Sequence, residues 1–171
     1  VNNVAEQRAS IIAATIRVLT RDGLVETTTR KIAAEANVNQ ATLRYYFGAK
    51  DDLLFAVLQE MMRVTRQIVQ TSLPMDEDLH TAIAKGLKAF WTHVEASPGL
   101  QIIQYELTMY ALRNPQSAWL AREQYDGYCS VIESLFEHYL EAAGKTSALP
   151  LAEVARFVVG GIDGLILQYI S

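Results

Sequence analysis

The chain has 171 residues, of which 50% are hydrophobic and 20% are charged, as in ordinary globular proteins. It can bury a substantial core in one or two domains, and no apolar run approaches the ~20 residues needed to cross a membrane. The single cysteine, Cys129, cannot form an internal disulfide, which favours a reducing cytosol. The sequence therefore predicts a cytoplasmic protein with no membrane partner.

The net charge of −4 is unevenly distributed along the chain. Residues 1–50 carry seven Lys and Arg against four acids, a net charge of +3. Residues 51–171 carry eight against fifteen, a net charge of −7. Because a cationic segment suits nucleic acid, we expect any DNA-binding surface to lie in the first 50 residues.

Three helices are predicted within these 50 residues, at about 5–22, 30–36 and 40–46. Gly23 ends the first helix, and the turn of residues 37–39 joins the second to the third. Thr28 or Thr29 is expected to cap the second helix, and Asn39 the third, through side-chain oxygens that accept from backbone N–H groups. An apolar inner face at helical spacing is formed by Ile32, Ala36, Val38, Leu43 and Phe47.

This layout is that of a helix-turn-helix, whose second helix presents its N-terminal residues to the major groove. Gln40 and Thr42 suit contacts with base edges, and basic and phenolic side chains around them suit phosphate oxygens. The candidate DNA-binding residues are Thr29, Arg30, Gln40, Ala41, Thr42, Arg44, Tyr45, Tyr46 and Lys50. Two short helices with a polar corner also occur in ordinary helical proteins, so the pattern alone leaves both interpretations open.

Between positions 8 and 55 the chain carries an ungapped pattern of residues that matches one known family signature position by position. The residues are Gly23, Thr28, Arg30, Ile32, Ala33, Ala36, Val38, Thr42, Leu43, Tyr46, Phe47, Lys50, Leu53 and Leu54. This pattern resembles the N-terminal signature of the TetR (tetracycline-repressor-like) transcriptional regulators. The chain departs from that signature at Asn37, Asn39, Ala41 and the pair Arg44-Tyr45, where the family usually has Gly, Ser, Gly or Pro, and Tyr-His. Since these positions fall where bases are read, the operator sequence does not follow from the resemblance.

Residues 51–171 predict further helices, at about 50–71, 76–96, 100–113, 116–143 and from 151 to the end, with a break at residues 73–76. No strand pattern appears, so the predicted fold class is all-α. A three-helix helix-turn-helix domain, residues 1–50, is joined to a helical ligand-binding and dimerisation domain, residues 51–171. The helix that begins at residue 50 would transmit shifts between the two.

The last two helices carry apolar residues on more than one face, and a helix that is apolar all round must be covered on all sides. Three glycines in the final helix each cost about 1 kcal/mol relative to Ala, which close helix approach would offset. We expect a two-fold homodimer built as a four-helix bundle, with interface residues Ile132, Phe136, Phe157, Gly160, Gly161 and Gly164. Alternatively, the glycines fit a crossing within one chain. Two-fold symmetry would require a palindromic operator.

Catalytic patterns are missing from the sequence. His80, His93 and His138 fall on different predicted helices and lack metal-ligand spacing, and Cys129 has no motif around it. We therefore expect no enzymatic activity, no metal and no cofactor. Glu106 and Asp163 are candidates for buried acids, and either could instead face solvent or cap a neighbour's backbone.

A ligand pocket is suggested by aromatic and methionine side chains on the helices after residue 50. The candidate ligand-binding residues are Trp91, Tyr105, Met109 and Tyr125. The family resemblance implies a small-molecule effector that shifts the population of dimers able to bind DNA. With Glu106 nearby, a cationic or hydrogen-bonding effector would fit.

Together these features predict a ligand-responsive, homodimeric transcriptional regulator, most simply a repressor, whose partners are double-stranded operator DNA and a small molecule. The alternative is an all-helical small-molecule binding or interaction module that does not bind DNA sequence-specifically. Duplex binding that weakens with salt distinguishes the two.

Overall fold

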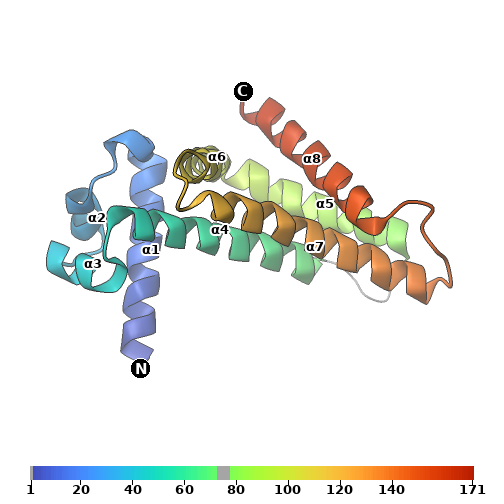
Figure 1. The fold of residues 1–171 in the computed structure, drawn as a ribbon, viewed down its shortest axis with the longest axis horizontal. Helices are drawn as coiled ribbons and strands as arrows, with labels where there is room; N and C mark the ends of the chain where they lie inside the picture. The colour runs from blue at the N-terminus through green and yellow to red at the C-terminus, as the bar shows by residue number, and fades with distance from the viewer. Residues whose placement is uncertain (1, 73–77) are drawn as a thin grey trace. The chain divides into compact units, whose positions relative to one another are not determined.

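The computed structural model describes residues 2–72 and 78–171, and within these ranges the chain forms eight α-helices and no strand (Figure 1). The helices are α1 (Asn2–Glu26), α2 (Thr29–Glu35), α3 (Gln40–Phe47), α4 (Lys50–Ser72), α5 (Leu79–Ala96), α6 (Pro98–Arg113), α7 (Ala118–Ala142) and α8 (Leu151–Ile170). The predicted all-α fold is confirmed. None of the described helices has the combination of length and apolarity that a membrane span requires.

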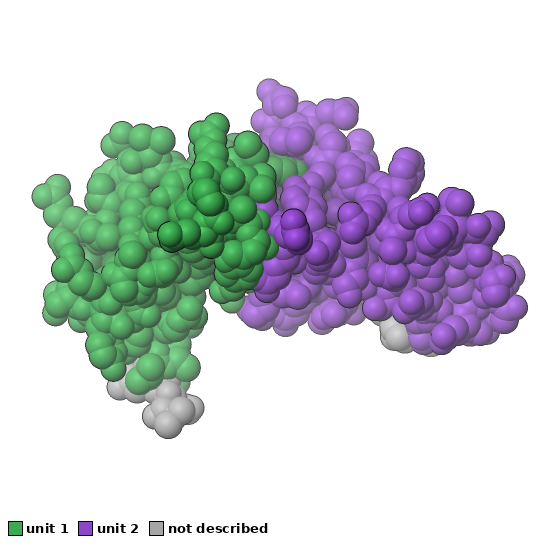
Figure 2. Space-filling view, in the orientation of Figure 1, with its two compact units in different colours: residues 1–61, 102–120 green, residues 62–101, 121–171 purple. Residues whose placement is uncertain are grey.

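The helices form two compact units, which Figure 2 shows in different colours. Unit 1 comprises residues 1–61 and 102–120, and unit 2 comprises residues 62–101 and 121–171. Helices α4, α6 and α7 contribute residues to both units. The first half of α4 and most of α6 thus pack in the same unit as the three N-terminal helices. A functional boundary near residue 50 stays a prediction.

Unit 1 is held together by an apolar core, and its two short helices depend on packing against this core for their stability. Helices α2 and α3 have seven and eight residues, well below the ~12–15 at which an isolated helix becomes even marginally stable. In the structure α2 packs on α1 and α3 packs on α2. The side chains buried in this unit include Ile11, Val18, Leu19, Ile32, Leu43, Leu53, Leu54 and Leu58.

Most predicted helix ends lie within a few residues of the observed ones. Gly23, with φ 76° and ψ 167°, breaks the helical geometry of α1 at the predicted end of the helix. After this kink the helix continues to Glu26. Helix α6 begins at Pro98, two residues before the predicted start. Proline suits the first turn of a helix, where its missing N–H has no partner to lose. The predicted break at residues 73–76 lies outside the described residues.

Unit 2 is formed by α5, α8, most of α7, the second half of α4 and the first residues of α6. Ala82 of α5 packs with Leu135 and Tyr139 of α7 in a buried cluster, and the partly buried Leu79 packs against it. The side chain of Arg66 on α4 extends to α7, because a Cβ added at Gly127 would lie 3.5 Å from Nη1 of Arg66. The rings of Trp91 on α5 and Tyr169 on α8 meet edge to face, 5.5 Å between centroids.

Candidate nucleic-acid interface

Helices α2 and α3 each begin with a side-chain cap. Thr28 Oγ1 accepts a hydrogen bond from Lys31 N (3.3 Å), and Asn39 Oδ1 accepts from both Thr42 N (2.8 Å) and Thr42 Oγ1 (3.1 Å). Between them Asn37 has φ 53°, a left-handed conformation that Asn tolerates better than most residues. The predicted caps and the predicted turn at residues 37–39 are confirmed.

Helix α3 is braced from behind and open in front. Leu43 and Phe47 are 2% and 6% exposed, so they anchor α3 to the core of unit 1. The opposite side is accessible to solvent. We call its exposed residues the reading face; they are Gln40, Ala41, Arg44 and Tyr45.

The other predicted DNA-binding residues surround the reading face in unit 1. Thr42 and Tyr46 are half-buried on the flank of α3, and Lys50 is half-buried at the first residue of α4. Thr29 and Arg30 open α2. All nine predicted residues therefore come from α2, α3 and the start of α4. Their contact with DNA stays a prediction.

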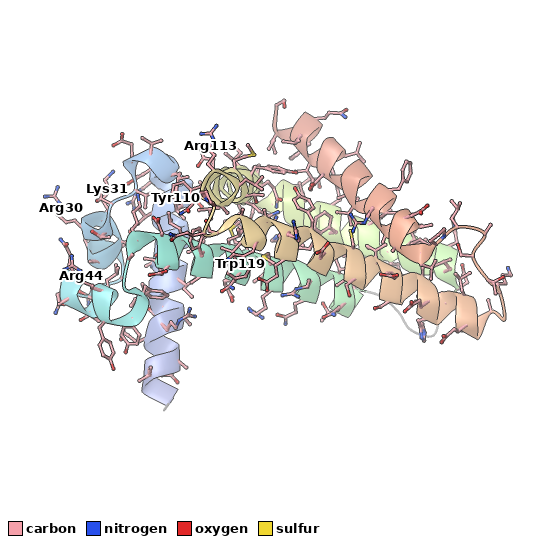
Figure 3. The ribbon with its side chains drawn as sticks, viewed as in Figure 1. Arg30, Lys31, Arg44, Tyr110, Arg113 and Trp119 are labelled. Atoms are coloured by element: carbon pink, nitrogen blue, oxygen red, sulfur yellow. The ribbon has the colours of Figure 1, made fainter. Side chains whose placement is uncertain are left out.

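Two arginines supply unpaired positive charge at this surface. Figure 3 shows Arg30 and Arg44 extending outward from α2 and α3, and both side chains are exposed. Within residues 2–72 and 78–171 neither arginine forms an ion pair. A guanidinium with no acidic partner can bind phosphate or a guanine edge without first breaking an ion pair.

Other cations of the same unit are already paired. Glu35 accepts from Arg17 Nε (2.8 Å) and Arg21 Nη1 (3.1 Å), while Asp22 contacts Arg21 Nε (2.8 Å) and Lys31 Nζ (3.0 Å). Hydrogen bonds from Arg17 and then Arg21 hold the pKa of Glu35 below its usual range, and those from Arg21 and then Lys31 do the same for the pKa of Asp22. This network ties α1 to α2, and it occupies Arg17 and Arg21 as ion-pair partners.

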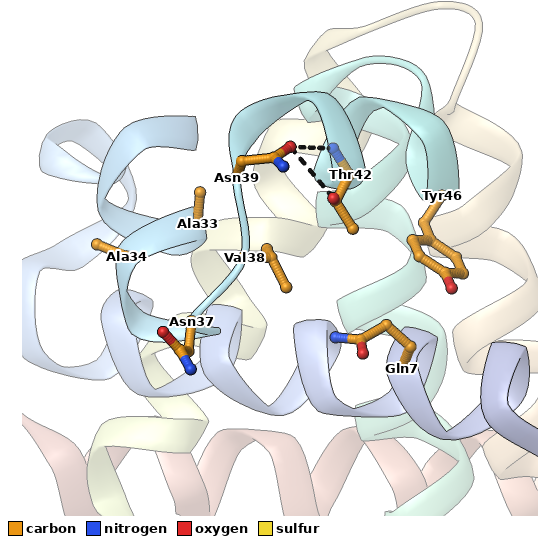
Figure 4. Close-up of a pocket in the computed structure, with 8 residues that line it drawn as sticks. All are labelled: Gln7, Ala33, Ala34, Asn37, Val38, Asn39, Thr42 and Tyr46. Carbon is orange, nitrogen blue, oxygen red and sulfur yellow. Dashed lines mark hydrogen bonds between the residues drawn. The ribbon is translucent and has the colours of Figure 1, made fainter.

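An open groove runs beside the reading face (Figure 4). Its volume is about 510 Å³, and its walls come from α1, from α2 with the following turn, and from the flank of α3. The polar side chains that line it are Gln7, Asn37, Asn39, Thr42 and Tyr46. The sequence did not predict this groove, because only the tertiary approach of α1 to the turn brings Gln7 to it.

The predicted ligand-binding residues divide between the two units. Trp91 and Tyr125 belong to unit 2, and both are half-buried. The indole N–H of Trp91 donates to Glu95 Oε1 (3.1 Å). Tyr105 and Met109 lie on α6 within unit 1, and Met109 is 50% exposed. A shared binding site for these four residues stays a prediction.

Glu106 has a structural task in unit 1. Its Oε2 accepts a hydrogen bond from the backbone N–H of Leu24 (3.3 Å), the residue that follows the break at Gly23. One of the roles expected for this acid, capping a neighbour's backbone, is thereby confirmed.

Tyr128 of α7 is a half-buried residue whose polar atom no sequence pattern predicted to be buried. Its hydroxyl is buried and has no hydrogen-bond partner among the described residues. Burial raises the pKa of this phenol, while the nearby side chains of Thr65 and Gln124 partly offset the rise. An unpartnered buried hydroxyl is costly, so it marks a place in unit 2 where a ligand or water can contribute a hydrogen bond.

The predicted interface residues lie on two helices of unit 2. Ile132 and Phe136 are half-buried on α7, whereas Phe157 of α8 is 83% exposed. A Cβ added at Gly160, Gly161 or Gly164 would meet no described atom within 4 Å. A helix crossing within the described chain therefore does not account for these three glycines.

The N-terminal part of the chain matches a protein-family model. Residues 11–57 match the model described as "Bacterial regulatory proteins, tetR family". The matched segment spans α2, α3 and most of α1, and it therefore includes the reading face and both caps.

Curated relatives extend the similarity over nearly the whole chain. The nicotine-responsive transcriptional repressor HdnoR of Paenarthrobacter nicotinovorans is 29% identical over 171 residues, which cover 99% of this chain and 86% of that repressor. The transcriptional regulator BetI of Burkholderia cenocepacia is 27% identical over 176 residues, covering 85% of this chain and 90% of BetI. Both are described as helix-turn-helix regulators.

Solved structures share the fold. A TetR transcription regulator from Haloarcula marismortui superposes with a TM-score of 0.84 at 21% identity, covering 97% of this chain and 87% of that one. The multidrug binding protein EbrR, solved with malachite green, has a TM-score of 0.68 at 28% identity, covering 95% and 86%. The predicted resemblance is thus confirmed by sequence and by fold: residues 11–57 match the TetR family model, and the chain is similar over most of its length to DNA-binding transcriptional regulators.

Proposed function

We propose that this regulator is a repressor that binds a palindromic operator as a homodimer and leaves it when a small molecule binds. The observation that carries the DNA-binding part is the open polar side of α3, with Gln40 and Arg44 exposed while Leu43 and Phe47 are buried behind them. Gln can pair bidentately with adenine, and Arg with guanine. A protein with this function would be located in the cytoplasm, together with the chromosome.

The dimer part of the proposal is supported by the outer face of α8. Phe157, Leu165 and Tyr169 are 83%, 56% and 45% exposed, although each is large and apolar or aromatic. The three glycines on the same helix leave its backbone accessible, since nothing described lies within 4 Å of their added Cβ positions. An exposed apolar face with accessible backbone suits close packing against the same face of a second copy.

The effector part is supported by aromatic side chains in unit 2. Tyr125 and Tyr128 meet edge to face, 6.3 Å between ring centroids, and the Tyr128 hydroxyl lacks a described partner. Trp91 adds an indole in the same unit. HdnoR is described as nicotine-responsive, and EbrR was solved with malachite green; both compounds are aromatic and contain nitrogen. We infer an aromatic effector that offers a hydrogen-bond acceptor to Tyr128.

DNA binding is tested by selecting bound duplexes from a random pool with the purified protein. The expected result is an enriched sequence whose two half-sites are related by a dyad, as two copies of α3 require. Affinity for that duplex should fall with salt, with a log–log slope of about −0.9 per phosphate neutralised. A pool that yields no enriched sequence at low salt would instead support the alternative of a helical binding module without operator recognition.

Effector binding is tested by adding nicotine or malachite green to the protein–operator complex. Release of the labelled duplex, together with a rise in the melting temperature of the free protein, is expected for a compound of the right class. Tyr128→Phe is the matched variant, because it removes only the hydroxyl. If the Tyr128→Phe protein releases DNA at the same compound concentration as the wild type, the effector does not need to accept a hydrogen bond from Tyr128, and that part of the proposal is wrong.

A further inference from the structure

We propose that the groove between α1 and α3 holds a sugar–phosphate segment of the operator through the uncharged side chains of Gln7 and Asn37. The inference rests on the proposed function, because it adds interactions with the same duplex. It goes beyond the predicted DNA-binding residues, none of which lies on α1 or in the turn.

Two amide side chains in the groove are available for binding. Gln7 is half-buried in the wall that α1 forms, and Asn37 is exposed on the turn. Neither amide hydrogen-bonds to another described residue, whereas the amide oxygen of Asn39 is occupied by Thr42. Each free amide offers two N–H donors. Asn and Gln are among the side chains that bind phosphate and sugar oxygens in protein–DNA complexes.

The position of the groove brings a DNA strand to these donors. Thr42 and Tyr46 lie four residues apart on α3, so they share one flank of the helix, and both line the groove. The major groove is about 12 Å wide and a helix with its side chains about 10–12 Å across. When the reading face enters the major groove, the flanks of α3 must therefore face its sugar–phosphate walls. The groove with Gln7 and Asn37 lies on one such flank (Figure 4).

The chemistry of the lining favours a backbone segment over a small molecule. A volume of about 510 Å³ falls in the range of ligand pockets, ~300–1,000 Å³, but those pockets are mostly apolar and bury their ligand. This groove is open, and five of its eight lining side chains are polar. The guanidinium of Arg8, next to Gln7 on α1, lies 5.0 Å from the ring centroid of Phe47 and adds positive charge nearby. An open polar groove beside a cation suits a polyanion.

The test compares duplex binding by the wild type, Gln7→Ala and Asn37→Gly, using fluorescence anisotropy with the selected operator. Both variants should fold, because Ala suits a helix and Gly adopts the positive φ of position 37 freely. Gln59→Ala, an exposed amide of α4 outside the groove, is the matched control. Each groove variant should bind about 3- to 10-fold more weakly, as expected when one or two hydrogen bonds per protomer are removed, and the control should bind as the wild type does.

Two features identify the missing interaction as an uncharged one with the DNA backbone. The preferred base sequence and the salt slope should stay those of the wild type, because no base reader and no cation has changed. A series of operators is prepared, each with one phosphate replaced by a neutral methylphosphonate. At one position per half-site the replacement should lower the affinity of the wild type but hardly change the affinity of Gln7→Ala. Energetic coupling at that phosphate places it in the groove.

The possible outcomes separate this inference from the proposed function. If the wild type selects an operator but both groove variants bind it as tightly, or no phosphate couples to Gln7, the inference is wrong and the function stands. A changed base preference would make Gln7 or Asn37 a base reader and would also overturn it. If the wild type binds no duplex selectively, the proposed function fails and this inference with it.

Discussion

The phenol of Tyr110 donates a hydrogen bond to Asp51 Oδ1 at 2.8 Å, joining α6 to the first turn of α4 within unit 1. This bond to the Asp51 carboxylate is the main reason why the pKa of Tyr110 is raised, because the bond stabilises the protonated phenol. Helix α6 is also fastened to the end of α1 by the bond between Glu106 and Leu24 N. Helix α6 thus holds both the end of α1 and the start of α4.

Removing the phenol hydroxyl should destabilise unit 1 measurably. Tyr110→Phe keeps the ring contact with Phe55, 6.5 Å between centroids, and removes only the bond to Asp51. The free energy of unfolding measured by urea denaturation should fall by about 0.5–1.5 kcal/mol. In a double-mutant cycle, Asp51→Asn should cost little more once the hydroxyl is gone. Fully additive effects would show that the two groups do not interact in solution.

Removing the cap of α3 should weaken the recognition helix. Asn39→Ala deletes the oxygen that accepts from Thr42 N and should cost about 1 kcal/mol of unfolding free energy. Asn39→Ser, whose hydroxyl can cap in the same way, is the control and should stay within a few tenths of a kcal/mol. Equal stability of both variants in urea denaturation would mean that the cap contributes nothing.

Gln40 and Lys50 should affect operator binding in different ways. Gln40→Ala should relax the preference at one base position of each half-site by roughly 1–3 kcal/mol. Lys50→Ala should weaken binding to all duplexes similarly and reduce the salt slope by about 0.9 for each phosphate that is no longer neutralised, hence about 1.8 for a dimer. Affinities for a panel of single-base operator variants provide the measurement. A uniform decrease across that panel for Gln40→Ala would exclude Gln40 as a base reader.

A large side chain at position 164 should separate the protomers. In the single chain, nothing described lies near an added Cβ at Gly164, and Leu is a better helix former than Gly by roughly 1 kcal/mol. Gly164→Leu should therefore fold but sediment as a monomer at concentrations where the wild type is a dimer. Gly164→Ala, a smaller change, should dimerise more weakly than the wild type but still associate. Wild-type sedimentation of the Leu variant would move the interface away from this face.

The ion-pair network between α1 and α2 should make unit 1 sensitive to acid. The pKa values of Asp22 and Glu35 are lower in the folded chain than their ordinary values of 3.8 and 4.5. The unfolded chain therefore takes up protons first as the pH falls. The stabilisation that the two carboxylates give the folded chain is lost as the pH falls through their ordinary pKa values and below them. Melting temperatures between pH 6 and pH 3 should fall less steeply for Glu35→Gln than for the wild type. Because water and ions reach these ion pairs, high salt should shrink the difference.

Local features of the fold followed from the sequence, whereas contacts between distant residues did not. Asn39 and Thr28 cap their helices because short polar side chains at those positions bond to nearby backbone, which needs no knowledge of the rest of the chain. The bond between Glu106 and Leu24 joins residues 82 positions apart, so only the packing of α6 against α1 reveals it. The groove beside α3 depends in the same way on where α1 passes Asn37.

In the proposed dimer, the apolar outer face of α8 would make the stability of the fold depend on protein concentration. A protomer alone would hold Phe157 and Leu165 in water, and a second copy that covers them stabilises the folded form by mass action. The melting temperature should then climb as the protein is concentrated. In a cell that holds few copies of the regulator, the fraction of dimer able to bind DNA would fall. A larger apolar face would strengthen the dimer and so lower the protein concentration at which the operator is still bound.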